Sequence, residues 1–162
     1  MPKRMSRTEW QRFLGGRRVA VLATIGDKGE PVLTPIWYLY RDGLVYMRTG
    51  ARSVKAANIR RDPRVTLCIQ DEQAPYRSVT VHGRASMIEE AEHGLGEAIA
   101  RRYLGAIAGA AYVRTAREAV EQSAEITLVV HPERVATQDF STETPMVGRL
   151  WLRAKRLLPP WL

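Results

Sequence analysis

The sequence predicts a mainly β domain with flanking helices, in which six or more short antiparallel strands form a small barrel. Apolar runs of strand length recur between turn signals rich in glycine, proline and aspartate, and helical periodicity is confined to a few segments. With 162 residues, of which 45% are hydrophobic and 26% charged, the chain has the composition of a single globular domain.

The N-terminal segment predicts a helix. Residues 6–9 read Ser-Arg-Thr-Glu, which is a capping-box pattern, and Trp10, Phe13 and Leu14 follow at helical spacing. Gly15 and Gly16 predict the end of this helix. We expect it to close one side of the barrel or sheet.

Three strands should follow, at residues 19–25, 31–40 and 44–49. Tight turns at residues 26–29 and 41–43 separate them, which predicts an antiparallel meander. Pro35 lies inside the second run, and a proline is tolerated there only at an edge or a bulge. A bulge would serve as a barrel corner or as a ledge that offers backbone groups to a ligand.

A short basic helix comes next. Ser53 suits its N-cap, and Pro63 predicts its end at Asp62. Cations and short polar side chains gather around its start and along its length: Thr49, Arg52, Ser53, Lys55, Asn58, Arg60 and Arg61. Such a group is either a phosphate site or a solvated basic helix face.

The remaining elements alternate between strand and helix. Strands are expected at residues 65–70 and 77–87, helices at 89–104 and 112–123, and a sixth strand at 126–130. His131 and Pro132 should stop the sixth strand, and residues 135–140 should extend it or pair with it. The tail at 148–162 reads as a basic amphipathic helix, so the predicted domain is 1–147. We expect the tail to dock on its own domain or on a partner subunit rather than on an anionic membrane.

Composition and spacing exclude several classes of protein. The formal net charge of +8 suits an anionic partner, but no nucleic-acid-binding motif occurs, so we expect no nucleic acid. The histidines lack metal-ligand spacing, so no metal site is expected, and His82 should be bonded locally on its strand. The single cysteine, Cys68, predicts a buried structural thiol in a cytoplasmic protein.

Three stretches, in this order, resemble the pyridoxamine 5′-phosphate oxidase-like flavoproteins. They are residues 19–31, residues 49–65 (TGARSVKAANIRRDPRV) and residues 77–84 (RSVTVHGR). The resemblance covers roughly residues 10–140 and implies the split β-barrel fold and a homodimer. Within the superfamily, residues 49–65 are most similar to the branch that binds the deazaflavin coenzyme F420.

The resemblance implies a role for each matching residue. Thr49, Ser53 and Lys55 would hold the cofactor phosphate, with help from Arg52, Asn58 or Arg60. Backbone groups of Pro35, Ile36 and Trp37 would lie along the ring, and Tyr76 and Arg77 would approach from the second subunit. Val54 stands where true pyridoxamine phosphate oxidases carry an arginine, which argues against vitamin B6 oxidation.

The function implied is that of an F420-dependent oxidoreductase that transfers hydride to or from a small conjugated substrate. FMN is the alternative cofactor, and a non-catalytic cofactor or haem carrier is the alternative role. The cofactor would carry the redox chemistry, so no side chain is assigned as a required acid or base.

Overall fold

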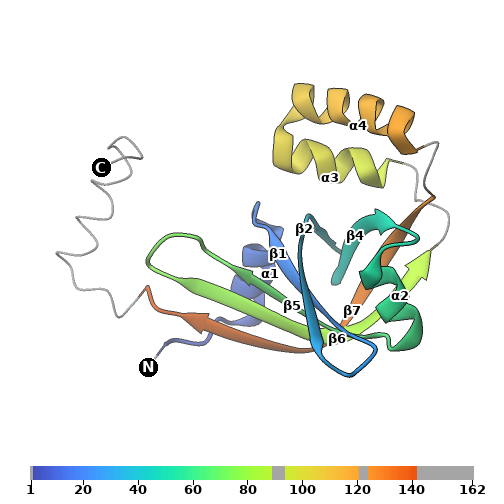
Figure 1. Cartoon of the computed structure of the whole chain (residues 1–162). Helices are drawn as coiled ribbons and strands as arrows, with labels where there is room; N and C mark the ends of the chain where they lie inside the picture. Colours follow the sequence, from blue (N-terminus) through green and yellow to red (C-terminus); the bar gives the residue numbers. More distant parts are fainter. Residues whose placement is uncertain (1, 89–93, 121–123, 142–162) are drawn as a thin grey trace.

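The computed structural model describes residues 2–88, 94–120 and 124–141, without the side chains of 116–120. Seven strands and four helices follow one another along these residues (Figure 1). The elements are α1 (Arg7–Gly15), β1 (Ala20–Ile25), β2 (Pro31–Ile36), β3 (Leu39–Arg41), β4 (Leu44–Gly50), α2 (Val54–Arg61), β5 (Arg64–Gln70), β6 (Arg77–Ile88), α3 (Leu95–Leu104), α4 (Ala106–Val120) and β7 (Glu125–Asp139).

The strands form one curled sheet in the order β2-β1-β5-β6-β7-β4-β3, and every neighbouring pair is antiparallel. The predicted fold class, mainly β with flanking helices, is therefore confirmed. Completely buried apolar side chains from five strands fill the inner face of the sheet: Leu22, Leu67, Val81, Leu128 and Met47. Apolar side chains of α1 and α2 complete this core: Phe13, Leu14, Ala56 and Ile59.

The predicted meander is wrong, because residues 31–40 form two strands instead of one. β2 pairs with β1 at one edge of the sheet, and β3 pairs with β4 at the other edge. The chain crosses the opening of the half-barrel at Trp37 and Tyr38, between these two strands. Pro35 lies on an edge strand in unbroken register opposite Val21, so the edge alternative is correct and the bulge alternative is wrong.

β7 does not stop at Pro132 as the sequence predicted. It continues to Asp139, and a register shift in its pairing with β6 falls between His82 and Gly83. β4 pairs with β7 only as far as Val130, so Pro132 has a strand neighbour on one side alone. A proline without an N–H is tolerated in a strand at such a position and at a bulge.

The two helices between β6 and β7 cover part of the outer face. Figure 1 shows α3 above the sheet with α4 outermost. Leu95, Ile99 and Ala100 of α3 are buried, and Thr127 and Val129 of β7 are buried although they face away from the barrel core. No described helix covers the outer face of β2, β1 and β5, and Leu33, Val21, Ala23 and Cys68 line an apolar depression there. Cys68 is only partly buried, so the prediction of a buried cysteine is wrong.

Among the described residues, no helix is long and apolar enough to cross a membrane. The capping box of α1 is present, with Ser6 and Glu9 each bonded to the other's backbone N–H. The predicted boundary at residue 147 and the tail at 148–162 lie outside the described residues.

Candidate functional site

The predicted phosphate residues lie together at the start of α2. Ser53 caps the helix, and its hydroxyl oxygen accepts from the backbone N–H of Ala56. The Thr49 hydroxyl at the end of β4 lies 3.2 Å from the Ser53 hydroxyl, and the Lys55 ammonium donates to Thr49 at 3.2 Å. Three side chains from a seven-residue stretch thus form one polar cluster, which we call the Thr49–Lys55 cluster.

The electrostatics of this cluster favour an anion. No described carboxylate forms an ion pair with Lys55, and the first turn of α2 contains no acidic residue. A helix start adds partial positive charge from backbone amides that have no partner within the helix. A lysine, two hydroxyls and such a helix start together are a donor set suited to phosphate.

Two of the proposed helpers lie at the rim of this cluster. Arg60 donates to the carbonyl of Ala51 at 2.8 Å, which ties the β4–α2 loop to the helix, and Arg52 is exposed beside it. Val54 is 67% exposed at the first position of the helix and brings no charge to the cluster. The site therefore depends on Lys55 for its central charge.

The side chain of Asn58 points towards β1 and not into the Thr49–Lys55 cluster. It is 5% exposed, donates to the Thr24 hydroxyl of β1 at 3.0 Å and accepts from Arg61 at 3.2 Å. These bonds occupy its side chain in fixing α2 against β1. The structure therefore does not bring Asn58 into the Thr49–Lys55 cluster.

The predicted ring segment lies along the same side of the half-barrel. The Thr24 hydroxyl, bonded to Asn58, also donates to the carbonyl of Val32, so the beginning of β2 adjoins α2. Pro35 follows three residues later, about 10 Å along the strand. Pro35 is exposed and Ile36 is buried, while the Trp37 ring stacks on Tyr103 of α3, with ring centroids 4.9 Å apart, and meets Tyr112 of α4.

Tyr76 and Arg77 lie at the opposite end of the sheet. Arg77 begins β6 and pairs with Asp139, whereas the cluster adjoins the other end, where Thr49 pairs with Ile126. The twelve residues of β6 separate these ends by about 35 Å. Tyr76 and Arg77 therefore cannot reach the Thr49–Lys55 cluster of their own chain.

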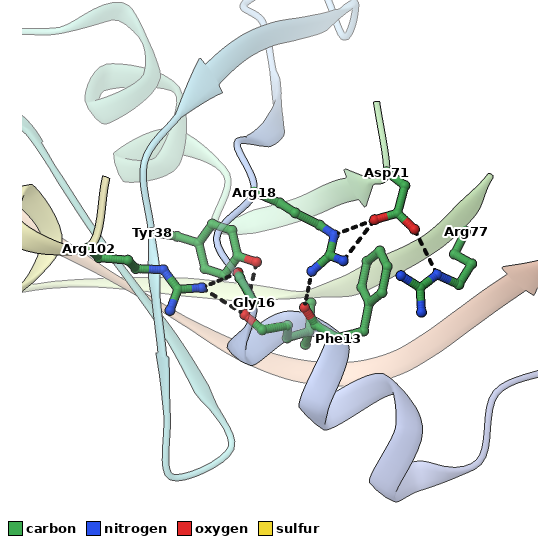
Figure 2. Close-up of polar contacts among 8 residues, drawn as sticks. Phe13, Gly16, Arg18, Tyr38, Asp71, Arg77 and Arg102 are labelled. Atoms are coloured by element: carbon green, nitrogen blue, oxygen red, sulfur yellow. Dashed lines mark hydrogen bonds and ion pairs between the residues drawn. The ribbon is translucent and has the colours of Figure 1, made fainter. Parts of the chain in front are cut away.

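Arg77 belongs to a charged network that the sequence did not predict (Figure 2). Its Nε donates to Asp71 at 2.7 Å, and Arg18 binds the other oxygen of Asp71 at 2.7 Å. The Arg18 guanidinium also lies 3.8 Å from the centre of the Phe13 ring. Because 53 residues separate Arg18 from Asp71, no local signal in the sequence could have joined them.

Arg102 of α3 was also missed. Its guanidinium donates to the main-chain carbonyls of Leu14, Gly15 and Gly16, so α3 caps the C-terminus of α1 (Figure 2). Tyr38 donates to the Leu14 carbonyl at 2.9 Å from the other side. Burial raises the pKa of Tyr38 to about 12. These bonds hold the helical hairpin beside Trp37.

The expectation that His82 is bonded locally on its strand is confirmed. His82 Nδ1 lies 3.1 Å from the Thr66 hydroxyl on the neighbouring strand, a local bond on the sheet surface. No group of histidine, cysteine and carboxylate side chains suited to a metal ion occurs in residues 2–88, 94–120 and 124–141.

Comparison with known proteins identifies the family. The family described as pyridoxamine 5′-phosphate oxidase matches residues 6–139, which is most of the chain. The chain belongs to this family. It shares the flavin-binding split β-barrel of the pyridoxamine 5′-phosphate oxidase-like superfamily, so the resemblance seen in the sequence is confirmed.

Solved structures support the same assignment. The conserved hypothetical protein Rv2991 from Mycobacterium tuberculosis is 33% identical over 87% of this chain and 89% of its own, with a TM-score of 0.72. An FAD-binding protein from Mesorhizobium loti is 21% identical over 86% of this chain and 98% of its own, with a TM-score of 0.62. A structure named F420 reductase is 18% identical over 77% of this chain and 94% of its own, with a TM-score of 0.56. The latter two likenesses concern the fold, and no curated protein matches the chain.

Proposed function

We propose that the protein is a cytoplasmic, homodimeric oxidoreductase that binds F420, or FMN as the alternative, and transfers hydride to or from a small conjugated substrate. The observation that carries this proposal is the Thr49–Lys55 cluster, in which a lysine without a described acidic partner joins two hydroxyls at a helix start. Both coenzymes present a phosphoryl group at one end of a ribityl chain, and this cluster offers the donors for it.

The chain's own residues would bind and orient the coenzyme. Lys55 supplies the charge, Ser53 and Thr49 supply short polar contacts, and backbone groups from Pro35 to Trp37 border the ring. The bound coenzyme supplies the hydride chemistry. Trp37, in contact with the rings of Tyr103 and Tyr112, would limit the movement of this segment and exclude water on the side of the helical hairpin.

A second copy of the chain would complete the pocket. The outer face of β2, β1 and β5 has an apolar depression that no described helix covers, with Leu33 63% exposed, and such a face favours self-association. Tyr76 and Arg77 lie about 35 Å from their own cluster, so only a partner arranged in the opposite direction would bring them to it.

Equilibrium titration tests the cofactor assignment. The full chain is titrated side by side with FMN, FAD and F420, and its tryptophan fluorescence is followed. We expect a saturable change with F420, with half-saturation at a lower concentration than with FMN or FAD. We expect Lys55→Ala to weaken binding at least tenfold, because it removes the central cation, and Val54→Ala at the adjacent exposed position to leave it unchanged. Equal affinity of Lys55→Ala and the parent chain would refute the phosphate assignment.

The carrier alternative needs a separate measurement. Reduced F420 and the protein are mixed without oxygen and with candidate enones or quinones, and absorbance of the coenzyme is followed. An oxidoreductase reoxidises the coenzyme at a rate that rises with enzyme concentration. Saturable binding without turnover would instead favour a carrier, and saturable haem binding without flavin binding would favour a haem carrier.

A further inference from the structure

A second cationic group lies on the outer face of the sheet, away from the Thr49–Lys55 cluster. In one row across β5, β6 and β7, Arg64 pairs with Arg84 and Arg84 pairs with His131. In the next row, Thr66 pairs with His82 and His82 pairs with Arg134. Residues directly opposite in antiparallel strands share a face, so these five basic side chains form one patch, the β5–β7 basic patch.

Little in the described structure neutralises this patch. Asp62 binds Arg64 through both carboxylate oxygens, with Nη2 to Oδ2 at 2.6 Å. Arg64 and, more weakly, Arg84 hold the pKa of Asp62 at about 2, so this carboxylate is already committed to Arg64. Glu133 stands at the register shift beside Arg134, but no ion pair joins a described carboxylate to Arg84 or Arg134.

This arrangement leaves Arg84 and Arg134 without a described counter-ion on an exposed sheet face. Like charges placed directly opposite each other on a sheet are destabilising, and here Arg84 faces Arg64. The side chain of Arg64 is 65% exposed, and Arg84, Arg134 and His131 are exposed as well. The patch is therefore open to a ligand in the described chain.

The histidines are oriented by neighbouring hydroxyls. The Thr66 hydroxyl lies 3.1 Å from His82 Nδ1, and the Ser86 hydroxyl lies 3.0 Å from His131 Nε2. Each contact fixes one ring nitrogen and leaves the other, Nε2 of His82 and Nδ1 of His131, to contact a ligand. The patch thus combines three guanidinium groups with two held imidazoles.

The size of the patch selects the ligand. Two strand-to-strand steps span about 10 Å, and the two rows lie about 7 Å apart. We propose that this patch binds a compact polyanion of the oligophosphate class, with Arg84 and Arg134 as its principal ligands. A single-stranded nucleic acid fits less well, because such sites combine a long basic track with aromatic stacking platforms and the patch contains no phenylalanine, tyrosine or tryptophan.

Calorimetric titration of the full chain with tripolyphosphate at low salt tests the proposal. The parent chain should bind one equivalent, with an affinity that falls steeply as salt is added and exceeds that for orthophosphate at least tenfold. The double variant Arg84→Gln/Arg134→Gln should lose at least tenfold in affinity. Arg101→Gln replaces an exposed arginine of α3 that pairs with Glu97 on the same helix; it is the matched control outside the patch and should bind like the parent.

Four results would overturn the proposal. Unchanged affinity of the double variant would remove its basis, and loss of tripolyphosphate binding in Lys55→Ala would move the site to the Thr49–Lys55 cluster. Tighter binding of a single-stranded RNA than of tripolyphosphate, abolished by the same double variant, would assign the patch to nucleic acid. Size-exclusion chromatography accompanies each variant, and a changed oligomeric state with unchanged tripolyphosphate affinity would show that the patch contacts a second copy. None of these results depends on whether a flavin coenzyme binds.

Discussion

The attachment of α3 to the end of α1 can be tested with one substitution, Arg102→Met. Methionine retains a long apolar stem and removes the guanidinium, so the main-chain carbonyls of Leu14, Gly15 and Gly16 lose their shared donor. Leu14 keeps a hydrogen bond from Tyr38, at 2.9 Å, and the Gly15 carbonyl can turn to water because its bond is exposed. The Gly16 carbonyl is partly buried and has no such replacement.

The expected loss follows from these partners. A hydrogen bond from a charged group contributes about 1.5–3 kcal/mol, and a cation at a helix C-terminus adds about 0.3–1 kcal/mol. Among the described residues, the Arg102 Nε is buried without a hydrogen-bond partner, so removing this N–H group offsets part of the lost stability. We expect a net destabilisation of about 3 kcal/mol, which lowers the melting temperature by about 6–12 °C for a chain of this size.

Thermal and urea unfolding, followed by far-ultraviolet circular dichroism, measure this loss. Arg101→Met is the matched control, because Arg101 precedes Arg102 on the same helix and pairs only with Glu97 at the surface among the described residues. Such a pair contributes about 0.3–0.5 kcal/mol. A loss below about 1 kcal/mol for Arg102→Met, or one equal to the control, would show that the three carbonyls do not depend on this side chain.

Two further predictions concern the register shift at Gly83 and the buried hydroxyl of Tyr38. Gly83→Ala should lower the free energy of unfolding by about 3 kcal/mol, because a Cβ there would lie 2.1 Å from the His131 carbonyl oxygen. Gly50→Ala is the control, because the space around its Cβ is open. In the same urea titration it should change the free energy of unfolding by less than about 1 kcal/mol. Equal effects of the two alanines would contradict a close approach at the register shift. The pKa of Tyr38 is about 12 in the folded chain, while the pKa of an unfolded tyrosine is near 10. The contribution of Tyr38 to the free energy of unfolding is therefore complete below pH 10 and is lost as the pH rises towards 12. Tyr38→Phe should therefore flatten the fall in stability between pH 10 and 12, and a parent and variant with parallel pH profiles would rule this out.

Short-range patterns in the sequence predicted the parts of the site that a few neighbouring residues determine. Ser53 and Pro63 delimit α2 through local caps, and Thr49, Ser53 and Lys55 come together because a strand end, a short loop and a helix start bring them within reach of one another. The capping box of Ser6 and Glu9 is predictable for the same reason. In each case the partners are separated by only a few residues, so backbone geometry alone makes them neighbours.

The sequence by itself therefore determined the strand periodicity, the ends of α1 and α2, and the donor set at the start of α2. It did not determine α4, which begins at Ala106 although the sequence predicted a break at 105–111 and a helix at 112–123. Tertiary structure decided which strands pair with one another. It divided residues 31–40 between β2 and β3 at opposite edges of the sheet, and it allowed β7 to continue past Pro132. It also turned Asn58 towards Thr24, joined Arg18 to Asp71 and set Arg84 between Arg64 and His131. These contacts link residues far apart in the chain, and their formation depends on long-range strand pairing and core packing that no local pattern specifies.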